Sequence, residues 1–207
     1  MPSQTFYNLS EEKRKKLVKV ALEEFSKVPF SDVSINTIIA KAEISRGSFY
    51  MYFQDKEDLF RFLLESHKQA FQKMTREAFQ HHDGDLFSSF TELFDGVLDY
   101  VERSENKEFI RNVFLNLNAR QEGFLIPHGD RFFHKHPQNE ILELVNRRLL
   151  KVQTDEDLIV AIRLLMDMTI QTIMSSICRS LSKEETKKIY LKKIEMLQYG
   201  IERRESC

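Results

Sequence analysis

The fold of this chain is decided by residues 34–56, which read SINTIIAKAEISRGSFYMYFQDK. Apolar residues at helical spacing predict one short helix at residues 35–42 and a second at residues 46–52. Residues 43–45 form the turn between them. Two short helices joined by so tight a turn are typical of a helix-turn-helix, whose second helix can enter the major groove of DNA. The predicted motif spans residues 34–53.

The second helix of the motif is too short to be an ordinary packing helix, and its residues divide between two kinds of face. Phe49 and Phe53 stand four residues apart, so both can point inward and anchor the helix. The other positions carry residue types that suit DNA. Arginine can bond a guanine edge, glycine permits close approach, and serine and tyrosine hydroxyls are common phosphate donors. These candidate contacts are Arg46, Gly47, Ser48, Tyr50 and Tyr52.

Residues 45–59, which read SRGSFYMYFQDKEDL, resemble the DNA-binding domain of the TetR family of bacterial transcriptional regulators. The family pattern at this point runs roughly s-k-g-[ST]-[LF]-Y-x-[YH]-F-x-[DS]-K-e-x-L. Upstream elements match it too, and the resemblance covers about the first 65 residues. The upstream matches are Ala21 and Phe25 in the helix expected at about residues 10–26, Ser34 as the cap of the helix at residues 35–42, and Ile39 and Ala40 within that helix.

The resemblance implies a DNA-contacting role for nine residues. From the first helix of the motif, phosphates or bases would be contacted by Ser34, Asn36 and Thr37. At the start of the second helix, base edges would be read by Arg46, Gly47 and Ser48. Phosphates would be bound by Tyr50, Tyr52 and Lys56. The family commonly has glycine where this chain has Glu43, so a left-handed backbone there would strain this residue.

Outside the motif, apolar residues recur at intervals of three and four, which predicts an all-α protein. Further helices are expected at about residues 10–26, 55–80, 141–152, 155–180 and 183–203, with two more between residues 86 and 117. A turn is expected at residues 81–84 and a long loop at residues 118–139. We expect an N-terminal three-helix DNA-binding domain at residues 1–55. A larger helical domain for effector binding and dimerisation would follow at residues 56–207.

The last two predicted helices carry more apolar surface than one core face requires. Either both helices are central in the monomer, or they pair with the same helices of a second copy in a four-helix interface. The resemblance favours a homodimer through residues 155–180 and 183–203. Such a dimer would bind a pseudo-palindromic operator in double-stranded DNA.

The interior is rich in aromatic residues, with seventeen phenylalanines and no tryptophan. An aromatic residue at helical spacing is more often part of a core than of a ligand site. If the effector domain contains a cavity, its lining would suit a small apolar or aromatic molecule. The candidate lining residues are Phe71, Met74, Phe90, Phe94 and Phe114.

Composition and motifs argue against several other classes. The formal net charge is −1, so any nucleic-acid surface must be local. Cys178 and Cys207 form no C-x-x-C pattern, which is typical of a reducing compartment. No signal peptide and no uninterrupted apolar stretch long enough for a bilayer is visible, so we expect a cytoplasmic protein without a membrane partner.

The sequence contains no recognisable catalytic or metal-binding pattern. The sequence has no phosphate-binding glycine-rich loop, no G-x-S-x-G and no H-E-x-x-H, so no catalytic residue and no cofactor is predicted. Five histidines lie near the two predicted turns and loops without the spacing of a zinc site, and no metal is predicted. They are His81, His82, His128, His134 and His136.

The sequence therefore predicts a sequence-specific DNA-binding transcriptional regulator. It would act as a repressor that a small apolar or aromatic ligand releases from its operator. One alternative is an all-helical ligand-binding protein or enzyme whose helix-turn-helix is merely structural. Another is a nucleoid-like DNA binder that responds to no effector.

Overall fold

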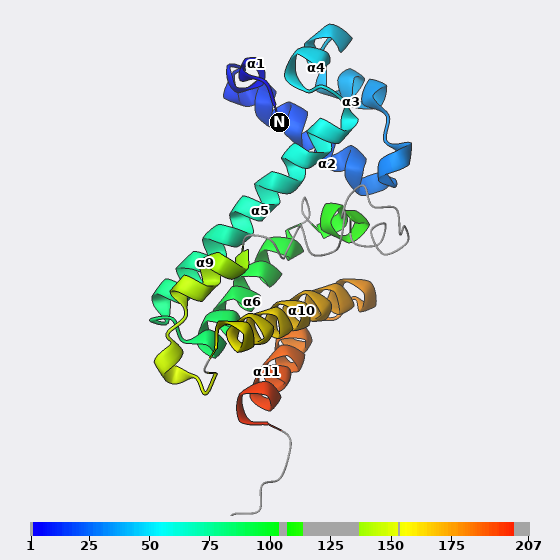
Figure 1. Ribbon diagram of the computed structural model, residues 1–207. Helices are drawn as coiled ribbons and strands as arrows, with labels where there is room; N and C mark the ends of the chain where they lie inside the picture. The colour runs from blue at the N-terminus through cyan, green and yellow to red at the C-terminus, as the bar shows by residue number, and fades with distance from the viewer. Residues whose placement is uncertain (1, 104–106, 114–136, 153, 201–207) are drawn as a thin grey trace, which may run out of the picture. The chain divides into compact units, whose positions relative to one another are not determined.

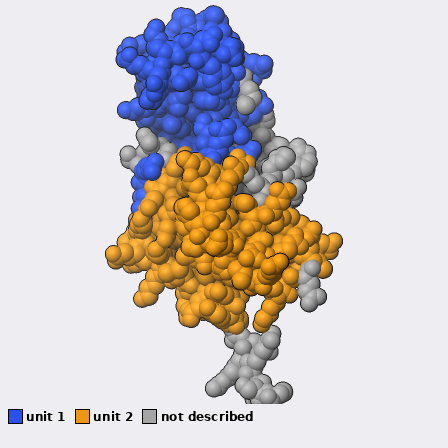
Figure 2. All heavy atoms as spheres, turned by 90° about the vertical axis from the view of Figure 1, so that its left-hand side faces the viewer, with its two compact units in different colours: residues 1–71, 101–125 blue, residues 72–100, 126–207 orange. Residues whose placement is uncertain are grey.

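The computed structural model describes residues 2–103, 107–113, 137–152 and 154–200, and every regular element in these ranges is a helix (Figure 1). The predicted all-α class is confirmed. The chain separates into two compact units, residues 1–71 with 101–125 and residues 72–100 with 126–207 (Figure 2). These units group residues by mutual contact, and the domain boundary at residues 55 and 56 stays a prediction.

The first unit contains the motif. Its helices are α1 (Gln4–Tyr7), α2 (Glu11–Lys27), α3 (Ile35–Ala42), α4 (Arg46–Tyr52) and the first part of α5 (Lys56–His81), with a 3-10 turn η1 (Phe30–Asp32). A further helical stretch covers residues 107–113. The bounds of α3 and α4 are those predicted from the sequence. Ser10 caps α2 by accepting a bond from the Lys13 amide, whereas α1 was not predicted.

Aromatic side chains form much of the core of the first unit. The ring of Phe25 in α2 lies 4.9 Å from that of Phe60 in α5, and Phe60 in turn lies 5.9 Å from Phe109. The Asn112 amide donates to the carbonyls of Phe25 and Val28, at 2.6 and 2.7 Å. Since the last carbonyls of a helix have no partner within it, these two bonds close the end of α2.

The second unit contains the rest of α5 together with α6 (Leu86–Glu102), α9 (Pro137–Leu144), the 3-10 turn η2 (Arg147–Leu149), α10 (Asp155–Arg179) and α11 (Lys183–Tyr199). Two predicted bounds are wrong. The helix expected at residues 141–152 begins at Pro137, because proline suits the first helical position, and ends at Leu144. The last helix ends at Tyr199, where Gly200 turns the chain with a φ of 81°.

Tyr190 of α11 lies at the centre of the second unit. Its ring is stacked on Phe94, with centroids 3.8 Å apart. Its hydroxyl shares a 2.8 Å hydrogen bond with the Thr169 hydroxyl of α10 and donates to the Phe90 carbonyl at 3.3 Å. Burial raises the pKa of Tyr190 well above its usual value. One side chain therefore joins α6, α10 and α11.

Among the described residues, α10 is the helix long and apolar enough to cross a membrane by length and composition alone. Core helices of soluble proteins pass the same test, and 39% of its most apolar window is buried in the structure. The exposed charged residues Arg163 and Asp167 interrupt the apolar sequence of the helix. This feature is weak evidence for a membrane span.

Candidate nucleic-acid interface

The turn between α3 and α4 requires a left-handed backbone at its first residue. Glu43 adopts φ 56° and ψ 41°, and its amide bonds back to the end of α3. The side chain of Glu43 forms a 2.7 Å ion pair with Lys16 of α2. A hydrogen bond from Lys16 lowers the pKa of the Glu43 carboxyl. The position where the family has glycine is therefore left-handed here, with the side chain directed to α2.

Helix α4 is anchored by Phe49 and Phe53, both almost completely buried, as predicted. Its first turn is capped by Ser45, whose hydroxyl accepts from the Ser48 amide at 3.0 Å. The Ser45 and Ser48 hydroxyls also share a 2.8 Å hydrogen bond. Sequence reasoning missed the cap, although serine just before a helix is the ordinary signal for one.

The exposed side of α4 presents Arg46, Gly47 and Tyr50. A guanidinium nitrogen of Arg46 donates to the Asn36 amide oxygen of α3 at 3.3 Å, and its central carbon lies 5.8 Å from the Tyr50 ring centroid. A Cβ built on Gly47 would have the Ser45 hydroxyl oxygen as its nearest neighbour, at 3.8 Å. Candidates predicted on two helices are thus brought together, beside a glycine with open space around it.

The remaining α3 candidates lie at its start. Ser34 has an extended backbone, and its carbonyl accepts from the Ile38 amide at 3.2 Å. Its exposed hydroxyl makes no capping bond, so it is available to an outside acceptor. Thr37, one turn further on, is half-buried.

Two candidates predicted to bind phosphate are engaged with the protein. The Lys56 ammonium donates to the carbonyls of Ser31 and Val33, each at 3.1 Å, and lies 4.7 Å from the Phe30 ring centroid. Tyr52 is half-buried, and its carbonyl accepts from an amide of the N-terminal segment. Lys56 therefore fixes the segment before α3 in addition to any contact with DNA.

The positions of α2 and α3 are further linked by charge. Glu24 of α2 pairs with Lys27 on its own helix and with Lys41 of α3. The hydrogen bond from Lys41 lowers the pKa of Glu24, and the same contact raises the pKa of Lys41. Helices α2 and α3 are thus joined by an ion pair as well as by packing.

Of the five candidate ligand residues, Met74, Phe90 and Phe94 belong to the second unit, where they are packed against other side chains. Phe90 and Phe94 are fully buried, and Phe94 is stacked on Tyr190. Met74 is half-buried, with its sulfur 3.5 Å from the Cβ position of Gly96. Phe71 is half-buried in the first unit, and Phe114 lies outside the described residues.

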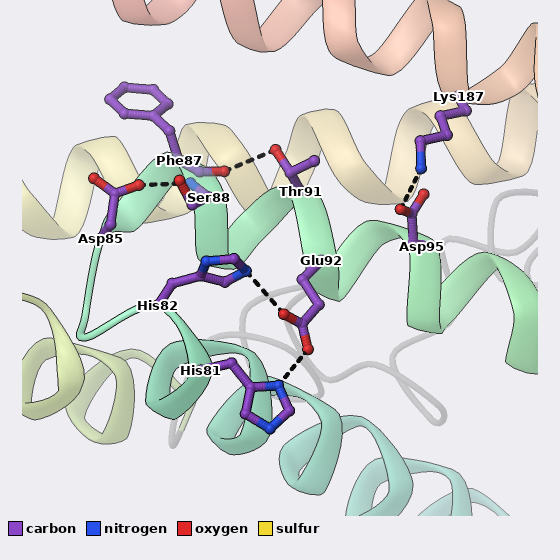
Figure 3. Close-up of polar contacts among 9 residues, drawn as sticks. All are labelled: His81, His82, Asp85, Phe87, Ser88, Thr91, Glu92, Asp95 and Lys187. Atoms are coloured by element: carbon purple, nitrogen blue, oxygen red, sulfur yellow. Dashed lines mark hydrogen bonds and ion pairs between the residues drawn. The ribbon is translucent and has the colours of Figure 1, made fainter.

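A hollow of about 400 Å³ lies on the second unit at the end of α5, along α6 and beside α11. Its lining includes Glu92, whose carboxylate is 2.7 Å from His81 Nδ1 and 2.8 Å from His82 Nε2 (Figure 3). The hydrogen bond with His81 lowers the pKa of Glu92. The lining residues are His82, Phe87, Ser88, Thr91, Glu92, Asp95, Ile194 and Gln198.

Within the described ranges, no three His, Cys, Asp or Glu side chains are grouped as a metal ion would require. The histidines at positions 128, 134 and 136 lie outside those ranges. The contacts of His81 and His82 with Glu92 join the end of α5 to α6.

Two family patterns match the chain. One, described as bacterial regulatory proteins of the tetR family, matches residues 17–63, which include α3 and α4. The other, described as the tetracyclin repressor-like C-terminal domain, matches residues 85–201, more than half of the chain.

Individual relatives agree with these patterns. The chain is 41% identical over 64 residues to the uncharacterised HTH-type regulator YdgC of Bacillus subtilis, covering 31% of this chain and 33% of that protein. It is 27% identical over 107 residues to the HTH-type regulator AcrR of Shigella flexneri, covering 52% and 50%. The aligned parts thus span a third to a half of these relatives. The fatty acid degradation regulator FadR of Bacillus halodurans shares the fold, with a TM-score of 0.70, 14% identity and coverage of 95% and 100%.

Proposed function

This chain belongs to the TetR family of DNA-binding transcriptional regulators, and we propose that it is a repressor released from its operator by a small molecule. Members of this family bind operator DNA, dimerise through the C-terminal domain and are not enzymes. The proposal goes further in three respects: the residues that contact DNA, the dimer interface and the class of effector. It also assigns the protein to the cytoplasm, where it meets its operator.

The exposed side of α4 is the observation that carries the DNA-binding proposal. Phe49 and Phe53 anchor the helix from within, and Arg46, Gly47 and Tyr50 are left exposed. Arg46 suits bidentate recognition of guanine, and Tyr50 suits a phosphate. The hydrogen bond that Arg46 donates to the Asn36 amide oxygen supports a role for Asn36 in orienting that guanidinium.

The other proposed contacts surround this group. Ser34 and Thr37 would meet phosphates from the start of α3, and Ser48 would contribute beside its hydrogen bond to Ser45. Tyr52 and Lys56 would contribute less than the resemblance alone implies, because the Tyr52 side chain is half-buried and the Lys56 ammonium also donates to two backbone carbonyls. We therefore rank Arg46 and Gly47 first for experiment.

Dimerisation through α10 and α11 is supported by apolar side chains that the monomer leaves exposed. On α10, Val160 and Leu164 are 66% and 50% exposed and lie one turn apart on one face. On the neighbouring α11, Ile189 and Met196 are exposed two turns apart on one face. Exposed apolar surface on adjacent helices is typical of a protein–protein interface.

The effector is proposed to be a small apolar or aromatic molecule bound in the second unit, among the candidates Met74, Phe90 and Phe94. Two of these side chains are fully buried, so a ligand reaching them must displace packed atoms. It would release DNA only if it binds the DNA-free conformation more tightly. Release of operator DNA by such a compound, with no effect on non-specific DNA binding, would support a sensor over a nucleoid-like protein.

The sharpest test of the DNA-binding surface is Gly47→Ala. Apart from the adjoining residues and the backbone of α4 itself, the nearest atom to the new methyl carbon is the Ser45 hydroxyl oxygen, at 3.8 Å, and alanine favours a helix over glycine by about 1 kcal/mol. We therefore expect the variant to unfold at the same or a higher urea concentration. If the start of α4 lies against DNA, the same methyl group will weaken operator binding, which fluorescence anisotropy can measure.

Gly96→Ala is a matched control for this experiment. Gly96 also lies inside a helix, and its added methyl group would make ordinary contact with Met74 at 3.5 Å. It should gain helix stability without changing DNA affinity. Equal operator affinity in wild type, Gly47→Ala and Gly96→Ala would contradict the proposed placement of α4.

A further inference from the structure

The short helix α1, which the sequence analysis did not predict, lies against the end of the proposed reading helix (Figure 1). The Ser3 amide donates to the Tyr52 carbonyl at 2.9 Å, and the Ser3 hydroxyl donates to the Met51 carbonyl. The last carbonyls of a helix have no partner within it. Ser3 therefore caps the end of α4 from a position 48 residues earlier in the chain.

Phe6 makes the apolar part of the same contact. It is fully buried, and its ring lies 5.0 Å from Phe53 at the end of α4 and 5.1 Å from Phe62 of α5. Phe6 thus lies beside Phe53, one of the two residues that anchor the reading helix. The ring of Tyr52 is also close, at 6.4 Å.

The segment that carries Ser3 and Phe6 is itself attached to α2. Arg14 of α2 donates to the Tyr7 carbonyl at 3.2 Å. The Leu9 amide bonds back to the Phe6 carbonyl at 3.2 Å, just before Ser10 caps α2. Residues 3–9 therefore connect a fixed point on α2 to the far end of α4.

Helix α4 needs such support because it has only seven residues. Isolated helices of that length are not stable in water, so its position depends on tertiary contacts. The beginning of α4 is fixed by Ser45 and by the turn from α3. Its end is fixed by Ser3 and Phe6.

We propose that residues 3–9 form an N-terminal clamp, in which Ser3 and Phe6 are positioning residues that hold the end of α4 in its DNA-reading orientation. This inference rests on the proposed DNA-binding function. Neither residue needs to touch a base, because each acts through Met51, Tyr52 and Phe53. Releasing the clamp reduces the fraction of molecules with α4 in place, and the apparent DNA affinity falls by that fraction.

The test compares Ser3→Ala and Phe6→Ala with the wild-type full chain. Helical circular dichroism and gel filtration report whether each variant keeps its fold and its assembly state. Operator affinity should fall about tenfold if α4 is in place one-tenth of the time. Thr5→Ala is the matched control, because Thr5 lies on the same helix and is exposed.

Hydrogen exchange gives a readout that does not depend on DNA. The amides of residues 50–53 should exchange faster in Ser3→Ala and Phe6→Ala, while those of α2 keep their protection. Phe6→Leu should restore part of the protection and part of the affinity, because it refills the apolar site. If Phe6→Ala fails to fold, Ser3→Ala alone decides the result.

The outcomes separate the clamp from the function it serves. Failure of the wild-type chain to prefer any DNA sequence would overturn the proposed function, whereas exchange at residues 50–53 would still report on the clamp. If Ser3→Ala and Phe6→Ala both fold and bind the operator as tightly as the wild type does, the clamp is overturned. Faster exchange over the whole of α2 to α4 would also overturn it, because the effect would then be general loss of stability.

Discussion

At the scale of single residues, Glu43 departs from the family pattern, and the structure shows how the turn accommodates it. A left-handed backbone costs an L-residue roughly 1–2 kcal/mol, which is why glycine is favoured at such positions. Glu43 adopts this backbone and forms an ion pair with Lys16 across the turn. Because solvent screens an exposed ion pair, the pair offsets only part of the strain.

Lys56 shows what a sequence pattern leaves open at this scale. The pattern predicts a lysine at the start of α5 near phosphate, but it contains no information on the carbonyls of Ser31 and Val33, 25 and 23 residues earlier. Those partners become visible only when η1 and α5 are placed together. Loss of DNA binding on replacing Lys56 must therefore be read beside a measurement of stability.

His67 carries a prediction about pH. It is buried in α5 against Phe109, and burial lowers the pKa of His67 to about 4 from 6.5. Between pH 6.5 and 4 the unfolded chain binds a proton that the folded chain does not, so stability falls as the pH falls. We expect a loss of about 2 kcal/mol between pH 7 and pH 5 from this residue.

Urea unfolding of wild type and His67→Leu at both pH values tests this contribution. The variant should lose less stability than the wild type when the pH is lowered, because the leucine cannot be protonated. Equal losses in the two proteins would mean that His67 is not the buried group responsible.

At the scale of elements, Gly84 determines how the turn between α5 and α6 meets the end of α9. Its φ is +77°, its amide bonds to Phe79 and its carbonyl accepts from Asn146, each at 2.9 Å. A Cβ there would lie 2.4 Å from the Leu144 carbonyl oxygen. Gly84→Ala should cost more than about 3 kcal/mol, from backbone strain and overpacking together.

Gly200→Ala separates these two causes. Gly200 has a similar φ of +81°, but no described residue other than its chain neighbours has an atom within 4 Å of its Cβ position. Gly200→Ala should cost only the backbone strain, about 1–3 kcal/mol for φ 81° with ψ 172°, in the same thermal or urea unfolding experiment. Similar losses of unfolding free energy in the two variants would show that the close approach of Gly84 to the end of α9 adds nothing to the cost of Gly84→Ala.

The elements also show which parts of the fold follow from local sequence. The bounds of α3 and α4 were predicted because apolar spacing, Ser34 and the short turn all lie within a few residues of each other. Helix α1 was missed because its four residues contain no helical repeat, and its partners lie on α4 and α5. The end of α9 was missed because a separate 3-10 turn, η2, begins just after it, and the Asn146 side chain caps that turn by accepting a bond from the Arg148 amide.

At the scale of the whole molecule, two copies are needed to read a palindrome. Leu164→Glu places a charge in the apolar surface of α10 that we propose as part of the dimer interface. We expect the variant to become monomeric by light scattering and to lose most of its operator affinity. Gln69→Glu on α5 is exposed and adds the same charge, so it should remain dimeric.

A dimer that persists in Leu164→Glu would place the interface elsewhere. Such a result would leave the exposed Val160, Leu164, Ile189 and Met196 without a partner, and their surface would then need another explanation. The monomer fold would be unaffected in either outcome, because Leu164 is half exposed.

The proposed ligand site is the part of the molecule that the sequence pattern described least. Phe90 and Phe94 were selected for being aromatic at helical spacing, and that spacing is shared by core residues such as these. The polar hollow around Glu92 combines the end of α5 and α6, which follow each other in sequence, with the distant helix α11. A concave surface of this kind depends on tertiary packing, which local patterns do not encode.

We propose that α4 reads DNA sequence. The most direct measurement is the ratio of two affinities at one salt concentration, one for operator DNA from upstream of the gene for this protein and one for scrambled DNA. Wild type should prefer the operator by about a thousandfold or more. Arg46→Ala should cost about 1–3 kcal/mol on the operator and reduce that ratio. An Arg46→Ala ratio equal to that of wild type, or a wild type without preference, would contradict the account.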